Sequence, residues 1–193
     1  MERYFLGNNS GSGFWNEYDG ELKMMDKVAL IKGGSGTGKS TIMKKIAAYA
    51  QKNGHDIEIW HCSGDPKSLD GVYIKDINRA VVDATAPHAS GADIPVVKDR
   101  IFDVANNLDK SKLDGMRDEI EKLIKCKKTH FMRVYQHLKS ALCHYINQIE
   151  IEKQGVDERK IRRIASEYCE KLFLADGGES RVRTLFSRAI SPS

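Results

Sequence analysis

The sequence predicts an α/β fold in which a mostly parallel sheet with flanking helices carries an α-helical extension. Two patterns lead to this prediction. Short apolar runs at residues 28–31, 57–62 and 79–82 are separated by turn residues and one helical pattern, an alternation typical of βαβ units. Beyond residue 95, apolar residues recur at helical spacing instead, as they do on amphipathic helices.

A glycine-rich loop is the most informative segment of the chain. Residues 33–40 read GGSGTGKS and satisfy the pattern G-x-x-x-x-G-K-[ST]. In such a P-loop, backbone N–H groups surround nucleotide phosphates, the Lys reaches the β/γ-phosphates and the Ser/Thr hydroxyl ligates Mg²⁺. The apolar run at residues 28–31 precedes the loop and a helical pattern over residues 41–52 follows it. This context favours a sheet of the P-loop NTPase type.

The motif predicts which residues bind the cofactor. Phosphate and Mg²⁺ are expected at a continuous segment, namely Gly33, Gly34, Ser35, Gly36, Thr37, Gly38, Lys39, Ser40 and Thr41. Residues 111–114, SKLD, imitate a guanine-reading N-K-x-D motif only faintly and fit a helix cap better. We therefore expect ATP rather than GTP. Separately, Asn53-Gly54 is expected to end the helix that follows the loop.

The other elements of the core follow from turns and apolar runs. Residues 1–26 predict a short strand or arm, a loop over residues 7–13 and a first helix over residues 14–25. Residues 57–62 predict a strand that stops at the turn Ser-Gly-Asp-Pro. The runs at residues 71–74 and 79–82 fit either a hairpin or an edge segment followed by a central parallel strand.

The second part of the chain predicts helices. Val97, Ile101, Val104 and Leu108 share one helical face, and similar spacing recurs up to residue 172. We expect about four amphipathic helices in an antiparallel bundle or hairpin pair. The chain is thus divided into a P-loop core (residues 1–95), a helical extension (96–176) and a return strand with a linker (177–193).

Two acidic residues stand where strands of the sheet are predicted to end. Asp83 closes the run at residues 79–82 and is the leading candidate to hold Mg²⁺ with Ser40 and to orient water. Asp65, after the strand at residues 57–62, is the second catalytic candidate beside Lys39, although Asp-Pro is also a turn pair. His61 and His88 follow the same strands and are candidates to touch phosphate or substrate.

Cations and cysteines restrict the partners that we expect. Arg181 and Arg183 are candidates to reach a γ-phosphate, whereas the basic run at residues 122–128 is expected to be a solvated helix face. A net charge of +4 without interleaved aromatic residues makes nucleic acid an unlikely partner. Four scattered cysteines and the lack of an 18-residue apolar run predict a cytoplasmic protein without a membrane segment.

Four segments resemble an uncharacterised family of bacterial P-loop ATPase-like proteins. They are residues 1–7 (MERYFLG), 31–41 (IKGGSGTGKST), 61–71 (HCSGDPKSLDG) and 82–88 (VDATAPH). The helical region is similar only in character. Members of this family carry two tandem P-loop halves, so the resemblance implies that this chain corresponds to an N-terminal half.

The family supplies no established substrate. Its members often have Pro where this chain has Ser35, a difference that leaves the P-loop pattern intact. The resemblance implies that the partner of this chain is a second P-loop half, and a homo-oligomer is the alternative.

The sequence leaves three functions open. The first is Mg-dependent ATP hydrolysis that drives a conformational switch in the helical extension or in a second half. The second is a small-molecule kinase in which Asp65 or His88 positions the acceptor hydroxyl. The third is a non-catalytic nucleotide-sensing module.

Overall fold

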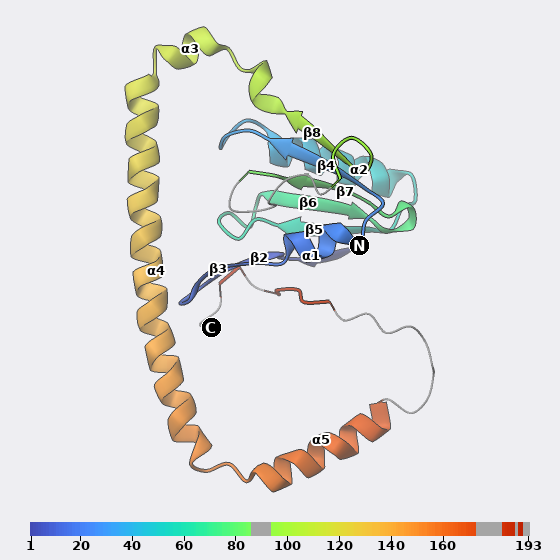
Figure 1. The fold of residues 1–193 in the computed structure, drawn as a ribbon, viewed down its shortest axis with the longest axis vertical. Coiled ribbons are helices and arrows are strands. Elements are labelled where there is room, and N and C mark those ends of the chain that lie inside the picture. The colour runs from blue at the N-terminus through green and yellow to red at the C-terminus, as the bar shows by residue number, and fades with distance from the viewer. Residues whose placement is uncertain (86–93, 173–182, 188, 191–193) are drawn as a thin grey trace.

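A six-stranded mixed sheet forms the core of the computed structural model, which describes residues 1–85, 94–172, 183–187 and 189–190 (Figure 1). In spatial order its strands are β1 (Glu2–Tyr4), β5 (Ile57–His61), β6 (Leu69–Ile74), β7 (Arg79–Asp83), β4 (Lys27–Lys32) and β8 (Asp99–Asp103). Of these six, β6 alone is antiparallel to its neighbours. The predicted α/β fold with a mostly parallel sheet is confirmed.

Strands β6 and β7 form a hairpin, which decides between the two alternatives for this segment. A 3₁₀ turn, η1 (Lys75–Ile77), connects them and ends at Asn78, whose φ of 49° is left-handed. Asparagine tolerates this conformation, and the Asn78 side chain donates to the Met24 carbonyl. Because β6 runs against its neighbours, its first residues lie at the same edge of the sheet as the last residues of β5 and β7.

Helices cover both faces of the sheet. Helix α2 (Lys39–Lys52) packs Met43, Ala47 and Ala50 onto a cluster that includes Ile57 and Val72. It ends at Gly54, with N–H bonds from Gly54 to the Gln51 carbonyl and from His55 to the Ala50 carbonyl. This is a Schellman motif, and it confirms the predicted end of the helix.

The opposite face is covered by the N-terminal segment. Here α1 (Tyr18–Lys23) contributes Tyr18 and Leu22 to a cluster around Trp60 and Leu30. Gly71 leaves room for the Trp60 ring, because a Cβ on Gly71 would lie 2.4 Å from Trp60 Cε3.

The N-terminal expectations were wrong in two respects. Residues 7–16 form a hairpin of β2 (Gly7–Ser10) and β3 (Gly13–Asn16) rather than a loop and the start of a helix. The first helix, α1, is correspondingly short. The physical reason is that polar residues of β2 are buried by tertiary contacts, and Asn9 donates to the Ser63 carbonyl. A hydropathy pattern cannot reveal such a strand.

Residues 97–108 do not form the predicted helix. Residues 99–103 form β8, which pairs with β4, and a 3₁₀ turn, η2 (Val104–Asn107), follows. The 3.6-residue spacing of the four apolar residues was coincidental, because backbone pairing to an edge position decides the structure here. The sheet therefore continues beyond residue 95.

The predicted helical bundle is also wrong. Beyond the short α3 (Lys110–Asp114), one 37-residue helix, α4 (Arg117–Lys153), replaces two of the predicted helices, and α5 (Glu158–Leu172) follows. No Gly or Pro interrupts residues 117–153, so nothing in the sequence ends the helix earlier. At 1.5 Å per residue, α4 is about 55 Å long.

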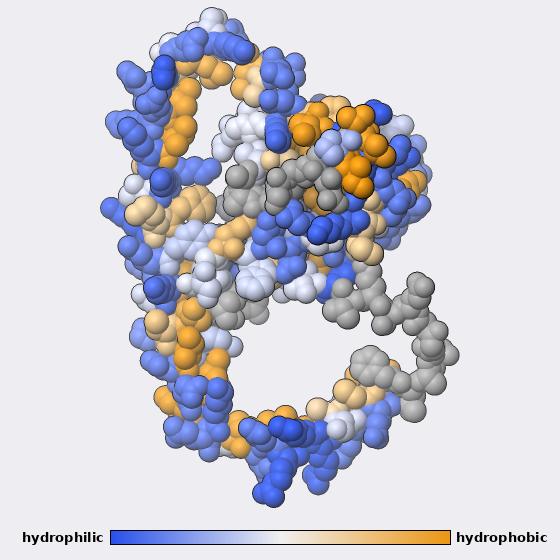
Figure 2. All heavy atoms as spheres, in the orientation of Figure 1, coloured by the Kyte–Doolittle hydropathy of each residue, from blue (hydrophilic) through white to orange (hydrophobic). Residues whose placement is uncertain are grey.

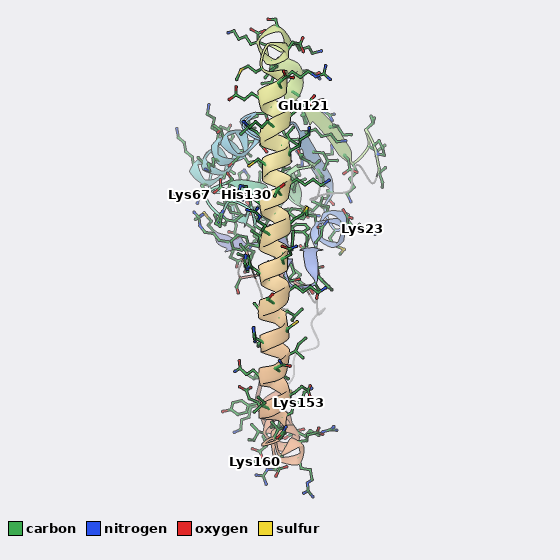
Figure 3. The ribbon with its side chains drawn as sticks, turned by 90° about the vertical axis from the view of Figure 1, so that its left-hand side faces the viewer. Lys23, Lys67, Glu121, His130, Lys153 and Lys160 are labelled. Carbon is green, nitrogen blue, oxygen red and sulfur yellow. The ribbon has the colours of Figure 1, made fainter. Side chains whose placement is uncertain are left out.

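Helix α4 passes beside the core and extends beyond it. His130 lies at the level of the sheet, and Lys153 lies well below it (Figure 3). Apolar side chains follow the side of α4 that faces the core and α5 (Figure 2). Exposed large apolar residues of α4, on any of its sides, include Leu123, Ile124, Met132, Ile146 and Ile151. Within the described parts of the chain, no helix combines the length and the apolar character that crossing a membrane requires.

The described C-terminal residues return to the N-terminal segment without forming a strand. Phe186 makes an isolated antiparallel bridge with Phe5, and Ile190 makes a parallel one with Asn9. Within residues 183–187 and 189–190, these bridges are the only strand-like pairing where a return strand was expected.

Candidate functional site

A cavity of about 890 Å³ lies at the edge of the sheet where β4, β5 and β7 end and β6 begins. Four parts of the chain supply its walls. They are the glycine-rich loop with the start of α2 (residues 35–41 and 44), the strand ends (62–65, 68–70, 83 and 85), the β2–β3 hairpin (9 and 14) and α4 (127, 131 and 135).

The loop is shaped by glycines. Gly36 and Gly38 have φ values of 80° and 91°, in the left-handed region that glycine adopts without strain. Gly38 is the N-cap of α2, where no side chain caps the helix and no acidic residue occupies the first turn. The start of α2 therefore presents uncapped N–H groups and the positive end of the helix dipole, which together favour an anion.

Lys39 reaches back over this loop. Its Nζ donates to the carbonyl oxygens of Gly33 and Gly34 at 2.6 and 2.8 Å. The same Nζ lies 3.5 Å from Asp83 Oδ2, and both side chains are nearly buried. The ammonium group is thus held at the cavity wall between the loop and the end of β7.

Asp83 lies at the position predicted for it, at the end of a strand beside the loop. Its Oδ1 accepts from the Thr85 N–H at 2.8 Å, while Thr85 Oγ1 donates to the Gly33 carbonyl at 3.0 Å. These bonds tie the segment after β7 to the beginning of the loop. They fix the carboxylate so that Oδ2 faces Lys39.

Ser40 also lines the cavity. Its Oγ accepts a hydrogen bond from the Leu69 N–H at 2.9 Å, which connects the first turn of α2 to the start of β6. A hydroxyl oxygen has two lone pairs, so this bond leaves Ser40 Oγ able to bind a second group.

Asp65 lines the cavity, but its carboxylate is engaged in its own turn. Oδ1 accepts from the Lys67 N–H and Oδ2 accepts from Ser68 Oγ at 2.6 Å. The hydrogen bond from Ser68, followed by that from the Lys67 backbone, lowers the pKa of this exposed carboxyl. The geometry agrees with the turn-forming role that the Asp-Pro pair suggested.

Asp70 is a functional candidate that sequence reasoning missed. It is buried, lines the cavity and accepts from Tyr18 Oη at 3.2 Å. The pairing of β5 with β6 shifts here, because Trp60 pairs with Gly71 while His61 pairs with Leu69. Asp70 is the extra residue, and such bulges commonly redirect a side chain. The available signal in the sequence was a carboxylate within the largely apolar segment at residues 69–74.

The surroundings of Asp70 keep neighbouring groups neutral. Burial, followed by the charge of Asp70, raises the pKa of the Tyr18 hydroxyl well above its ordinary value. The same two causes raise the pKa of the Cys62 thiol to about 11. This end of the cavity thus combines one carboxylate with a protonated thiol, and the protonated phenol that donates to the carboxylate is fully buried and outside the cavity lining.

Other predicted candidates lie elsewhere. His61 is not among the cavity residues, and it donates from Nδ1 to the Pro66 carbonyl while accepting from Arg3. His88 and Arg181 lie outside the described residues.

The expectation that a flexible Arg183 reaches a phosphate is wrong. Its guanidinium binds the carboxylates of Glu21 and Glu58 at 2.7 and 2.8 Å, and Glu58 is fully buried. Two carboxylates around one guanidinium form a fixed structural centre on the α1 side of the sheet.

Helix α4 supplies a cation that the sequence did not single out. Lys127 lines the cavity, donates to Ser35 Oγ at 3.3 Å and lies 5.9 Å from the centre of the Phe131 ring. It belongs to the basic run at residues 122–128, which resembles an ordinary solvated face in the sequence.

The charges of the cavity wall are of both signs. Three lysines lie near the loop, namely Lys39, Lys44 and Lys127, and three aspartates line the strand ends, namely Asp65, Asp70 and Asp83.

Comparisons with protein-family models, curated proteins and solved structures found no match for this chain. The chemistry of the site is therefore deduced from its own residues.

Proposed function

We propose that the chain is an ATP-binding protein of the P-loop NTPase type that hydrolyses Mg-ATP to drive a conformational switch. One observation carries this proposal. Lys39, at the uncapped start of α2, lies 3.5 Å from Asp83 at the end of the neighbouring strand. Phosphoryl transfer needs a cation that stabilises the phosphates and a carboxylate that holds the metal or orients the nucleophile. This loop brings one of each together.

The loop binds the phosphates. Backbone N–H groups of residues 34–40 surround them, and the Lys39 ammonium turns from the Gly33 and Gly34 carbonyls toward the β/γ-phosphates. The α2 dipole adds to this attraction. ATP is proposed over GTP because no base-reading N-K-x-D motif accompanies the loop.

The residues present fit Mg²⁺ as the nucleotide's metal. Groups of three or more His, Cys, Asp or Glu side chains able to hold a metal do not occur among the described residues. Mg²⁺ in phosphate sites needs only one or two protein ligands, with phosphates and waters completing its octahedron. Ser40 Oγ and the Asp83 carboxylate, both on the cavity wall, would be those ligands. When bound, the metal neutralises charge on the β- and γ-phosphates.

Asp83 also positions the attacking water. Its carboxylate, fixed by Thr85, would accept a hydrogen bond from a water on the cavity side of the loop. Attack by this water forms a new O–P bond to the γ-phosphorus, breaks the bond to the bridging oxygen and releases the proton of the water through the Asp83 carboxylate to solvent, giving ADP and phosphate. Lys39 stabilises the negative charge of the transition state.

Phosphate release measures this function. The chain with ATP and Mg²⁺, and without any added acceptor, is expected to release phosphate, whereas Lys39→Ala is not. Equal release by the two proteins would remove the loop from the mechanism.

A kinase is the second candidate, favoured by the extent of the cavity. The cavity continues past the loop to Asp70, a buried carboxylate that accepts from Tyr18 Oη, and Asp70 is proposed as the group that accepts the proton of an acceptor hydroxyl. Both carboxylate oxygens of Asp65 are engaged in its own turn. ADP formation that appears only when a pool of hydroxylated metabolites is added would favour this candidate over hydrolysis.

A further inference from the structure

Helix α4 forms one wall of the cavity through a single face. Lys127, Phe131 and Tyr135 all line it, and their spacing of four residues places them on the same side of the helix. Figure 3 shows the helix crossing in front of the core with His130 at this level. The long extension is therefore part of the site.

Two contacts set the height of α4 against the core. Tyr135 Oη donates to Asn9 Oδ1 at 2.8 Å. Lower on the helix, Leu142 packs against Gly11 so closely that a Cβ on Gly11 would lie 2.6 Å from Leu142 Cβ. Both contacts are made with the β2–β3 hairpin, and together they place Lys127 beside the loop.

Lys127 differs from the other two lysines of the cavity in its surroundings. Lys39 lies beside Asp83, and the charge of Lys44 contributes to the lowered pKa of Asp65. The Lys127 ammonium instead donates to the neutral Ser35 hydroxyl, and no carboxylate of the described residues lies within ion-pair distance of it. A cation on a flexible stem beside a neutral group can turn toward an anionic ligand without breaking an ion pair.

We infer that Lys127 binds the terminal phosphate of the nucleotide and so makes the seating of α4 depend on the nucleotide state. This inference rests on the proposed function. The start of α2 and Lys39 hold the phosphates at one end of the loop, whereas Lys127 reaches the loop from α4, at Ser35. We assign to Lys127 the phosphate farthest from the base, which ATP has and ADP lacks.

Binding of the terminal phosphate by Lys127 would change how firmly α4 is held to the core. With a triphosphate bound, α4 is held to the core by a charge-assisted hydrogen bond in addition to Tyr135 and Leu142. Hydrolysis removes that third contact, and α4 is then held by the hairpin contacts and by the hydrogen bond from Lys127 to the neutral Ser35 hydroxyl. The nucleotide state is thereby transmitted to a helix about 55 Å long.

Binding measurements on matched variants test this inference. Titration calorimetry with Mg²⁺ and either ATPγS or ADP would compare the wild type with Lys127→Ala, Lys127→Arg and Lys128→Ala. Lys128 is the neighbouring helix lysine and is not a cavity residue. Lys127→Ala should weaken ATPγS about tenfold, the loss expected for one charge-assisted hydrogen bond, and leave ADP within about twofold. Lys127→Arg should retain most of the affinity, and Lys128→Ala all of it.

Hydrogen exchange provides a second readout. ATPγS should slow amide exchange at the α4 N-terminal half in the wild type, and ADP should not. Lys127→Ala should abolish that difference, which a purely structural role would not predict.

Different outcomes overturn different claims. If Lys39→Ala binds ATPγS as well as the wild type, the proposed function fails. If Lys39→Ala loses binding while Lys127→Ala keeps the wild-type affinity, only the role of Lys127 fails. Equal losses in Lys127→Ala and Lys128→Ala would also overturn it, since they would indicate a general effect of charge.

Discussion

The ammonium of Lys39 lies 3.5 Å from the carboxylate of Asp83, with 10% and 12% of the two side chains exposed. The register of the sheet explains this proximity. In the parallel pairing of β4 with β7, Ile31 lies opposite Asp83. The loop that leaves β4 therefore begins at the level of the Asp83 carboxylate, and the first residue of α2 returns beside it.

Asp83→Asn tests the catalytic half of this pair. The amide oxygen can still accept from the Thr85 N–H, so the segment should keep its shape, but the negative charge is lost. ADP affinity should stay within about twofold, while Mg-dependent turnover should fall about 100-fold, as when a catalytic electrostatic group is removed. Steady-state phosphate release measures the effect.

Asp65→Asn is the matched control, because Asp65 lines the same cavity but is engaged in its own turn. It should retain near wild-type turnover. Full activity in Asp83→Asn together with a large loss in Asp70→Asn would transfer the role to Asp70.

Arg183→Met should destabilise the fold without affecting the nucleotide. The substitution leaves the carboxylates of Glu21 and Glu58 without their guanidinium, and Glu58 is fully buried. The free energy of unfolding should decrease by about 3 kcal/mol, the usual consequence of removing one partner of a buried ion pair. Urea denaturation measures it. A normal stability combined with weakened ATP binding would restore the phosphate role.

Acid should also destabilise the ion cluster that Arg183 forms with Glu21 and Glu58. Burial alone would raise the pKa of Glu58, but hydrogen bonds from Arg183 and Trp60 outweigh it and hold the pKa below its ordinary value of 4.5. A depressed folded-state pKa contributes stability above the unfolded-state value, and this stability is lost as the pH falls through the folded-state pKa. Denaturation between pH 6 and pH 3 should show this loss in the wild type.

Glu58→Gln provides the comparison for the acid titration. It should be less stable at neutral pH and show a flatter decline below pH 4.5. Parallel curves for the two proteins would exclude Glu58 as a source of the acid sensitivity.

Cys62 should be the slowest of the four cysteines to alkylate. Burial and the charge of Asp70 raise its pKa to about 11, so almost no thiolate forms at neutral pH. The other three, Cys126, Cys143 and Cys169, are exposed. Mass spectrometry after a short iodoacetamide pulse at pH 7.5 would establish the order. Rapid labelling of Cys62 would contradict the environment assigned to Asp70.

Local signals made the centre of the fold predictable. The loop, the strand before it and α2 with its Gly54 end all lie where the sequence placed them, because turn chemistry and short apolar runs act within a few residues. The sequence also predicted that Asp83 would end a strand beside the loop. What it could not predict depends on contacts between distant segments.

Three particular elements show why. Strand β2 of the hairpin is polar and is buried by other parts of the chain, so its hydropathy resembles that of a loop. Strand β8 forms by pairing with β4, and no local sequence pattern indicates this pairing between distant segments. Lys127 belongs to the site only because α4 is one unbroken helix that passes the loop.

The most direct test of the central claim is nucleotide binding at the loop. Calorimetric titration of the wild type with ATPγS and Mg²⁺ should give one binding site per chain. Lys39→Ala should show no measurable binding while retaining a cooperative thermal transition, because the cation on the β/γ-phosphates is gone. Lys44→Ala, which removes a lysine from the same helix and the same cavity, should still bind. Unchanged ATPγS affinity in a folded Lys39→Ala would contradict the account.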